Sequence, residues 1–154
     1  MLKEGDKAPD FRARTDSGEE FQLPQLKGKR VVLYFYPRAN TPGCTIEACE
    51  FRDHAEQFSQ RDTVIVGVSP DKPDAQAKFK RNRRLPFTLL ADTDKTAAQS
   101  YGVWKEKQNY GKSYMGIERT TFLLDSAGKL ARIFPKVKPA EHHTEVLEAL
   151  KSVP

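Results

Sequence analysis

The chain has 154 residues, the usual length of one domain, and 38% of them are hydrophobic, which is enough to form a core without disulfide bonds. The contents of charged residues (31%) and aromatic residues (10%) argue against a disordered or fibrous protein. The net charge of +5 is too small an excess to identify a partner. We therefore expect one globular domain over residues 1–154.

No segment is typical of a membrane span or a secretion signal. The longest apolar run, residues 31–36, ends at Pro37 and is far shorter than the roughly 20 residues that cross a bilayer. The N-terminal segment MLKEGDKAPDF contains no apolar stretch of the kind found in signal peptides. We expect a cytoplasmic protein without membrane contacts, and in that reducing compartment its two cysteines are predicted to be reactive thiols.

The first part of the chain predicts a hairpin, a buried strand and a helix. Residues 15–23, with the turn-forming sequence Asp-Ser-Gly inside them, predict a small N-terminal hairpin. Residues 31–36 are continuously apolar, which is typical of a core strand buried on both faces. Thr41 followed by Pro42 is typical of a helix N-cap and first position, so a helix is expected to run to about Gln60.

The middle of the chain continues this alternation. Residues 64–68 predict a second buried strand, and Asp71 with Pro73 is expected to open a helix that ends at about Arg83. Residues 87–91 predict a third strand, and residues 95–101 a short helix.

The last third is expected to begin with a long loop over residues 102–116. Residues 119–124 and 130–134 then predict an antiparallel hairpin, and a final helix carries Val146, Leu147 and Leu150 on its apolar face. Alternating strands and helices indicate parallel pairing with right-handed crossovers, and the late hairpin adds antiparallel strands. The predicted fold is α/β, with a mixed central sheet flanked by helices on both faces.

The two cysteines lie five residues apart in the first predicted helix. Cys44 falls in the first turn, where unpaired backbone N–H groups and the helix dipole favour a thiolate. Cys49 has two open interpretations, a silent core cysteine or a redox partner of Cys44. In an intact helix the two Cα atoms would be about 8.6 Å apart, beyond the roughly 7 Å limit for a disulfide, so a bond between them requires the helix to unwind.

Two other functions are disfavoured by the sequence. A structural zinc site needs four ligands, and the Cys-x4-Cys spacing together with His54, His142 and His143 forms no recognisable set. The densest basic cluster is interpreted as a solvated helix face, with nucleic-acid binding as the alternative. Its members are Lys78, Lys80, Arg81, Arg83 and Arg84.

The sequence around the first cysteine resembles a known family. In PRANTPGC, the residues Pro37, Thr41 and Cys44 have the spacing of the PxxxTxxC active-site motif of peroxiredoxins, and YFYPRANTPGCTIEACEFRD resembles the bacterioferritin comigratory protein, or peroxiredoxin Q, subfamily. The similarity extends over essentially the whole chain, through KAPDF, GVSPD, PFTLLAD, YGVW, GIERTTFLLD and KVKPAEHHTEVLEAL. It implies a thioredoxin-like fold with an N-terminal β-hairpin extension.

The resemblance also implies roles for individual residues. Cys44 corresponds to the peroxidatic cysteine, which attacks the peroxide and becomes a sulfenic acid. Thr41 would hydrogen-bond the peroxide, Pro37 would shield the sulfur, and Arg119 would place its guanidinium near Cys44. From the sequence alone, Thr41 is equally a helix N-cap, Pro37 a strand terminator and Arg119 a surface cation.

Glu47 and Cys49 complete the set of candidate site residues. Glu47 lies one turn beyond Cys44, where an unpaired carboxylate would oppose the thiolate, so we expect it to pair with Arg119 or to face solvent. Cys49 matches the resolving cysteine of many subfamily members. The sequence departs from the subfamily at Phe134, where tryptophan is common, and at Glu141, where glycine is common.

The resemblance implies a thiol peroxidase that acts on hydrogen peroxide and organic hydroperoxides. Cys44 would form a disulfide with Cys49, and thioredoxin or a glutaredoxin-like dithiol protein would reduce it. No metal, haem, flavin or other cofactor is implied, and a monomer is expected. Three alternatives stay open: a one-cysteine peroxidase with an external resolving thiol, a thioredoxin-like disulfide reductase, and a basic nucleic-acid-binding module.

Overall fold

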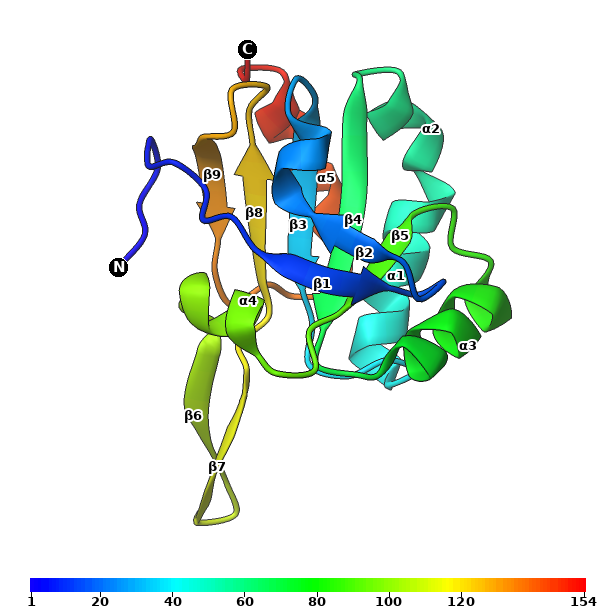
Figure 1. The fold of residues 1–154 in the computed structure, drawn as a ribbon, viewed down its shortest axis with the longest axis vertical. Helices are drawn as coiled ribbons and strands as arrows, with labels where there is room; N and C mark the ends of the chain where they lie inside the picture. The colour runs from blue at the N-terminus through cyan, green and yellow to red at the C-terminus, as the bar shows by residue number, and fades with distance from the viewer.

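A computed structural model describes all residues from Met1 to Pro154, and its centre is a mixed sheet of seven strands (Figure 1). The strand order is β2-β1-β5-β4-β3-β8-β9. β3, β4 and β5 pair in parallel, and the other neighbouring pairs are antiparallel. The strands are β1 (Arg12–Thr15), β2 (Glu20–Gln22), β3 (Arg30–Phe35), β4 (Thr63–Ser69), β5 (Thr88–Ala91), β8 (Thr120–Leu124) and β9 (Leu130–Phe134).

Helices cover both faces of this sheet. They are α1 (Pro42–Asp53), α2 (Ala55–Ser59), α3 (Pro73–Arg83), α4 (Thr96–Ser100), α5 (His142–Leu150) and the 3-10 helix η1 (Leu23–Leu26). None of them is long and apolar enough to cross a membrane. In Figure 1, α1 and α5 lie behind the sheet, and α4 lies in front of it together with the N-terminal hairpin.

The apolar run predicted as the core strand lies between two hydrophobic cores and contributes side chains to both. Val32, Tyr34 and Tyr36 point into the core shared with α1, α3 and α5, whereas the alternating residues Val31, Leu33 and Phe35 point into the core under α4. Side chains of a strand alternate between faces, so a strand with a core on each side must be apolar at every position. This confirms the prediction of a buried core strand and of helices on both faces.

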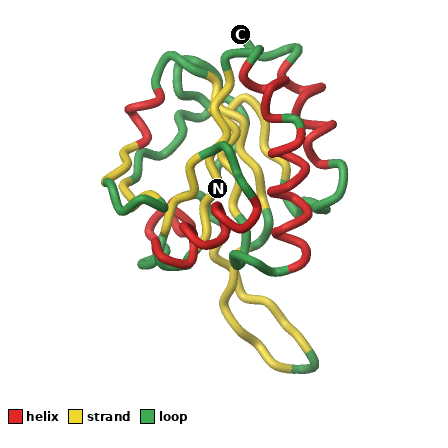
Figure 2. Tube along the Cα trace, turned by 90° about the vertical axis from the view of Figure 1, so that its right-hand side faces the viewer, coloured by secondary structure: helices red, strands yellow, loops and turns green.

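Two predictions about individual elements are wrong. The helix expected to reach Gln60 is interrupted at His54, where the backbone leaves helical geometry (φ −115°, ψ 14°) between α1 and α2. Residues 102–116 are mostly a hairpin of β6 (Trp104–Asn109) and β7 (Lys112–Ile117), which extends away from the body of the molecule (Figure 2). Its turn residues Tyr110 and Gly111 both have positive φ, as two-residue hairpin turns require.

The helix expected to open with Asp71 and Pro73 is confirmed as α3, which runs from Pro73 to Arg83. The N-cap of this helix is Lys72 and not Asp71. The carboxylate of Asp71 instead accepts hydrogen bonds from the backbone N–H of Ala39, at 2.7 Å, and from the hydroxyl of Ser69. Asp71 therefore links the end of β4 to the segment that precedes α1.

Glu141 is the N-cap of α5 and has left-handed backbone angles (φ 63°, ψ 8°), which glycine adopts without strain. We expect Glu141→Gly to raise the free energy of unfolding by about 0.5 kcal/mol, because relief of the backbone strain exceeds the entropy that glycine adds to the unfolded chain. Urea denaturation of the reduced protein measures this change. The control Glu148→Gly, at an exposed helical position of α5, is expected to lower stability by about 1 kcal/mol. Equal losses in both variants would contradict the strain at Glu141.

Candidate active site

The thiol of Cys44 lies in the first turn of α1, directly after the chain leaves β3. Thr41 has extended backbone angles (φ −85°, ψ 156°) and Pro42 is the first helical residue, as predicted. The first helical hydrogen bond runs from the N–H of Thr45 to the carbonyl of Thr41 at 2.9 Å. The N–H groups of Gly43 and Cys44 therefore have no partner within the helix, and they make this turn a favourable place for negative charge.

Arg119 reaches Cys44 from the neighbouring strand of the sheet. It directly precedes β8, and β8 pairs antiparallel with β3 so that Thr120 lies opposite Phe35, the last residue of β3. This register places Arg119 beside the C-terminal end of β3. Its Nη2 donates to the Sγ of Cys44 at 3.3 Å, and Cys44 itself is only 1% exposed.

The same guanidinium also holds Glu47, so the expected pairing of these two residues is present. Nη1 of Arg119 donates to Oε1 of Glu47 at 2.8 Å. The side chain of Glu47 is completely buried and that of Arg119 is 15% exposed, so both charges are largely removed from water. Oε2 of Glu47 is buried without a hydrogen-bond partner.

Burial dominates the ionisation of Glu47. It raises the pKa of this carboxyl from 4.5 to about 7, although the charge and the hydrogen bond of Arg119 act in the opposite direction. Near neutral pH the group consequently changes between a neutral acid and a carboxylate. The carboxylate and a thiolate at Cys44 would both draw on the single positive charge of Arg119.

Thr41 and Pro37 precede Cys44 in the chain, and the hydroxyl of Thr41 does not cap the helix. Its Oγ1 donates to the carbonyl of Arg38 at 2.8 Å, and no side-chain cap bond is formed. The acceptor capacity of the hydroxyl is thus left for another donor. Pro37 is half-buried and follows Tyr36, whose N–H makes the last backbone bond from this strand to β4, at Val68.

Three residues around the site were not identified from the sequence. A Cβ atom at Gly43 would lie 3.1 Å from Nη2 of Arg119, so glycine here allows the guanidinium to approach the helix. Tyr34 has a fully buried hydroxyl without a partner, and burial, followed by the charges of Tyr36, Glu47 and Cys44, raises its pKa. A Cβ at Gly67 would lie 2.9 Å from the Tyr34 ring, which explains the glycine in β4.

Lys107 in β6 is a further residue that was not identified from the sequence. Its pKa is lowered by burial and then by the positive charge of Arg119, while Cys44 acts in the opposite direction. The hairpin therefore brings a second cation into the electrostatic field of the thiol. No pattern in the sequence distinguishes Lys107 from the other lysines of a segment that was expected to be a loop.

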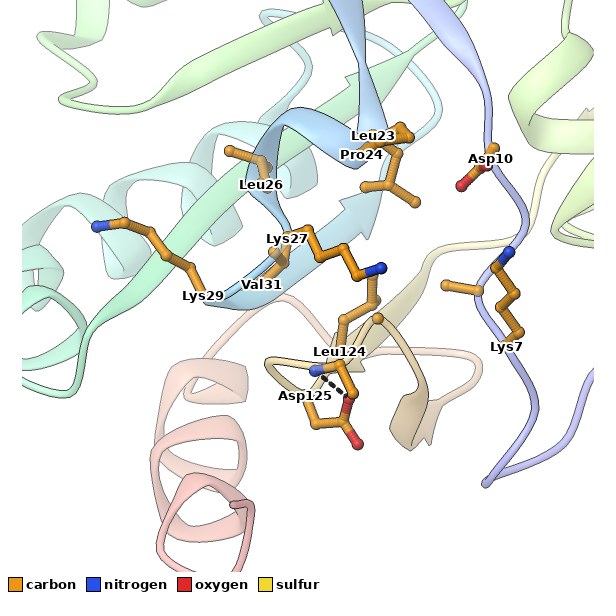
Figure 3. A pocket seen from close by; sticks show the side chains of 13 residues that line it. Lys7, Asp10, Leu23, Pro24, Leu26, Lys27, Lys29, Val31, Leu124 and Asp125 are labelled. Atoms are coloured by element: carbon orange, nitrogen blue, oxygen red, sulfur yellow. Dashed lines mark hydrogen bonds between the residues drawn. The ribbon is translucent and has the colours of Figure 1, made fainter.

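A separate pocket lies at the opposite end of the sheet and contains none of these residues (Figure 3). Its volume is about 250 Å³, and it is formed where β3 begins and β8 ends. Residues that line it include Lys7, Leu23, Lys27, Val31 and Leu124.

The buried carboxyl of Glu47 predicts a characteristic dependence of stability on pH. The folded protein binds this proton more tightly than the unfolded chain, so the contribution of Glu47 to stability is complete below about pH 4.5 and is lost as the pH rises through about 7. The loss amounts to about 3 kcal/mol at about 1.4 kcal/mol per pKa unit. We expect the substitution Glu47→Gln to remove this decrease.

Urea unfolding of the reduced protein between pH 4.5 and 8 tests the prediction. Glu56→Gln, which removes an exposed carboxyl from α2, is the matched control and should retain the decrease seen in the unsubstituted protein. If the stability of the Glu47 variant falls with pH in parallel with that of the control, Glu47 does not carry the buried proton.

The chain is similar to known proteins over nearly its whole length. Residues 4–133 match the AhpC/TSA family. Peroxiredoxin Bcp of Bacillus subtilis is 51% identical over 97% of this chain and 95% of its own length, and Peroxiredoxin Bcp of Escherichia coli is 43% identical over 97% and 96%.

Solved structures agree with the sequence comparison. The bacterioferritin comigratory protein of Xanthomonas campestris, described as having alkyl peroxide reduction activity, superposes with a TM-score of 0.91 at 34% identity and covers 97% of this chain and 98% of its own. Peroxidoxin BcpB of Mycobacterium tuberculosis gives 0.89 at 36% identity, with 100% and 99% covered. The thioredoxin-like peroxiredoxin fold expected from the motif is therefore confirmed, and the chain belongs to the AhpC/TSA family, among its Bcp-type peroxiredoxins.

Proposed function

We propose that this peroxiredoxin reduces hydrogen peroxide and organic hydroperoxides at Cys44. The thiolate sulfur attacks one oxygen of the peroxide bond, an S–O bond forms as the O–O bond breaks, and the leaving oxygen takes a proton to become water or an alcohol. Cys44 becomes a sulfenic acid. The observation that carries the proposal is the 3.3 Å contact between its Sγ and Nη2 of Arg119 in the first turn of α1.

Arg119, Thr41 and the free N–H groups of the first helical turn are proposed to stabilise the transition state. An ordinary cysteine thiol is already about 3% thiolate at pH 7, so complete ionisation gains only about thirtyfold in rate. Thiolates in solution react slowly with peroxides, and the remaining acceleration must come from groups that stabilise charge as the O–O bond breaks. The hydroxyl of Thr41 has an acceptor free for a protonated peroxide oxygen.

Glu47 and Pro37 are proposed to support this arrangement. The 2.8 Å bond from Arg119 to Glu47 fixes the orientation of the guanidinium, which leaves Nη2 directed at the sulfur. Pro37 closes the end of β3 without a backbone N–H of its own and shields the sulfur from water. Both act on the geometry around Cys44, and neither needs to exchange atoms with the peroxide.

Cys49 is proposed as the resolving cysteine. It is half-buried in α1, and the chain contains no third cysteine that could form an intramolecular disulfide. Its thiol would attack the sulfur of the Cys44 sulfenic acid and expel water. Because both residues lie in one helix, where their Cα atoms are too far apart for a disulfide, the N-terminal half of α1 must unwind first.

The unwound segment would then present the disulfide to a dithiol reductant. We propose thioredoxin or a glutaredoxin-like protein for this step, since such proteins act by thiolate attack on an accessible disulfide sulfur. We also propose that the protein is a cytoplasmic monomer and that residues 1–154 form a single domain. A one-cysteine reaction with an external thiol is the alternative, because Cys49 lies in a regular helix in the reduced state.

The roles of the two thiols are tested by intact mass and peptide mapping after the reduced protein receives one equivalent of hydrogen peroxide. We expect the unsubstituted protein to lose two hydrogens and to contain a Cys44–Cys49 link. Cys49→Ser should stop at a sulfenic acid on Cys44 that a dimedone-type reagent traps, and Cys44→Ser should not react. A stable sulfenic acid in the unsubstituted protein would establish the one-cysteine alternative, and an unmodified protein would contradict the peroxidase proposal.

Arg119→Leu tests transition-state stabilisation separately from ionisation. At a pH at which Cys44 is fully thiolate, we expect its single-turnover rate with hydrogen peroxide to fall by at least about 100-fold, because a preorganised cation at the breaking bond is lost. Arg119→Lys keeps the charge without the fork that spans Cys44 and Glu47 and should have an intermediate rate. If the leucine variant reacts as fast as the unsubstituted protein under these conditions, Arg119 acts only on ionisation or not at all.

A further inference from the structure

A cluster of two histidines and one glutamate lies at the opposite end of α1 from Cys44. Glu50 belongs to the last turns of α1, His54 occupies the break between α1 and α2, and His143 is the second residue of α5. One ligand atom from each of the three lies within 4.8 Å of the other two. The imidazole rings are stacked, with centroids 3.9 Å apart, and Oε2 of Glu50 is 3.1 Å from Nδ1 of His143.

The hydrogen bonds around the cluster leave one nitrogen free on each ring. Nδ1 of His54 donates to the backbone carbonyl of Glu50 at 2.9 Å, so its Nε2 carries a lone pair. On His143, Nε2 contacts the hydroxyl of Thr144 at 3.3 Å, whereas Nδ1 is buried and lies 3.1 Å from the Glu50 carboxylate without forming a hydrogen bond to it. Metal-binding histidines commonly have this arrangement, in which the second ring nitrogen is oriented by a carbonyl or another polar group.

His143 provides the strongest indication that the cluster has a ligand. The residue is only 8% exposed, and its Nδ1 makes no hydrogen bond although the Glu50 carboxylate is 3.1 Å away. Leaving a buried polar nitrogen without a hydrogen bond is unfavourable. A cation bound between Nδ1 and the Glu50 carboxylate would satisfy both groups.

A bound ion would have access to the cluster from solvent. His54 and His143 line an open depression between α2 and α5, together with Gln57, Arg61 and Leu147. Because a metal ion lies in the plane of each imidazole that binds it, the stacked rings must turn about their side-chain bonds when the ion enters. His54 is half-exposed and lies outside regular helix, which leaves its ring room for that rotation.

We propose that Glu50, His54 and His143 form a binding site for a divalent transition metal ion, with Zn²⁺ as the best match. Two imidazole nitrogens and one carboxylate oxygen are a common Zn²⁺ ligand set, and a water molecule completes the tetrahedron. The site takes no part in peroxide chemistry. It connects the C-terminal half of α1 to α5.

The position of this site couples it to the redox cycle, an inference that rests on the proposed role of Cys49. Glu50 directly follows Cys49, so the movement of Cys49 toward Cys44 that forms the disulfide displaces the adjacent metal ligand. The ion therefore binds the reduced, fully helical form more tightly than the disulfide form. By thermodynamic reciprocity, the bound ion opposes disulfide formation to the same extent.

Binding is tested in a protein without thiols, because cysteines themselves bind zinc. In the Cys44→Ser/Cys49→Ser protein, titration calorimetry should detect one equivalent of Zn²⁺. Co²⁺ should give a visible spectrum of tetrahedral nitrogen and oxygen coordination. We expect His54→Gln and His143→Gln, added singly, to weaken binding more than about tenfold. Glu148→Gln, which removes a carboxylate from the same depression, should not.

Absence of stoichiometric binding, or binding that neither histidine substitution weakens, would overturn the site. Circular dichroism of each variant checks that the loss does not reflect unfolding.

The coupling has its own measurement. In the protein with both cysteines, one equivalent of Zn²⁺ should slow the conversion of the Cys44 sulfenic acid to the disulfide severalfold, and His143→Gln should abolish this effect. An unchanged rate despite confirmed metal binding would overturn the coupling and leave the site. If no disulfide forms with or without zinc, the proposed role of Cys49 fails, while the calorimetric result on the thiol-free protein stands independently.

Discussion

The guanidinium of Arg119 is the group on which the arrangement of the active site depends. It is bonded at once to the buried carboxyl of Glu47 and to the sulfur of Cys44. Removing a cation and an anion from water is unfavourable, and their mutual attraction recovers that free energy only with good geometry. One oxygen of Glu47 has no hydrogen-bond partner, and the pKa of the carboxyl is raised. The attraction to Arg119 therefore recovers only part of the free energy lost on burial. The buried pair therefore orients the guanidinium toward the sulfur but lowers the free energy of unfolding.

The sheet makes this arrangement possible. Arg119 lies near Cys44 because β8 pairs antiparallel with β3 in a register that brings the start of one strand to the end of the other. Beneath α1, Tyr34 packs on Phe51 with ring centroids 4.9 Å apart, and Gly67 leaves space for the Tyr34 ring. A rigid, closely packed strand thus supports a helix whose first turn must change during the proposed reaction.

The two ends of α1 have different environments. The first turn holds the thiol among charged groups, and the last turns place Glu50 and His54 against α5. Between them, Ala48 and Phe51 are fully buried in the core. Apolar burial in the middle of the helix would allow its beginning to unwind while the remainder stays attached, because local opening is easiest where few apolar contacts must be broken.

Local sequence patterns were sufficient for much of the fold and for the position of Cys44 at the start of a helix. Continuous apolar residues predicted β3 and β4, and Thr41 with Pro42 predicted where α1 begins, because strand burial and helix capping depend on neighbouring residues. The hairpin of β6 and β7 was missed because its strands are largely exposed and lack the apolar alternation that marks a half-buried strand. The break at His54 was missed because none of the usual stop residues, glycine or proline, is present there.

By itself, the sequence determined most of the strand-and-helix order, the cysteine at a helix start and, through its motif, the peroxiredoxin family. Only the tertiary structure decided which distant side chains meet. Strand register brings Arg119 to Cys44, helix packing brings His143 to His54, and the β6–β7 hairpin places Lys107 within the electrostatic influence of Arg119. Such contacts are set by the packing of whole elements against one another, and a single sequence carries no local pattern that records them.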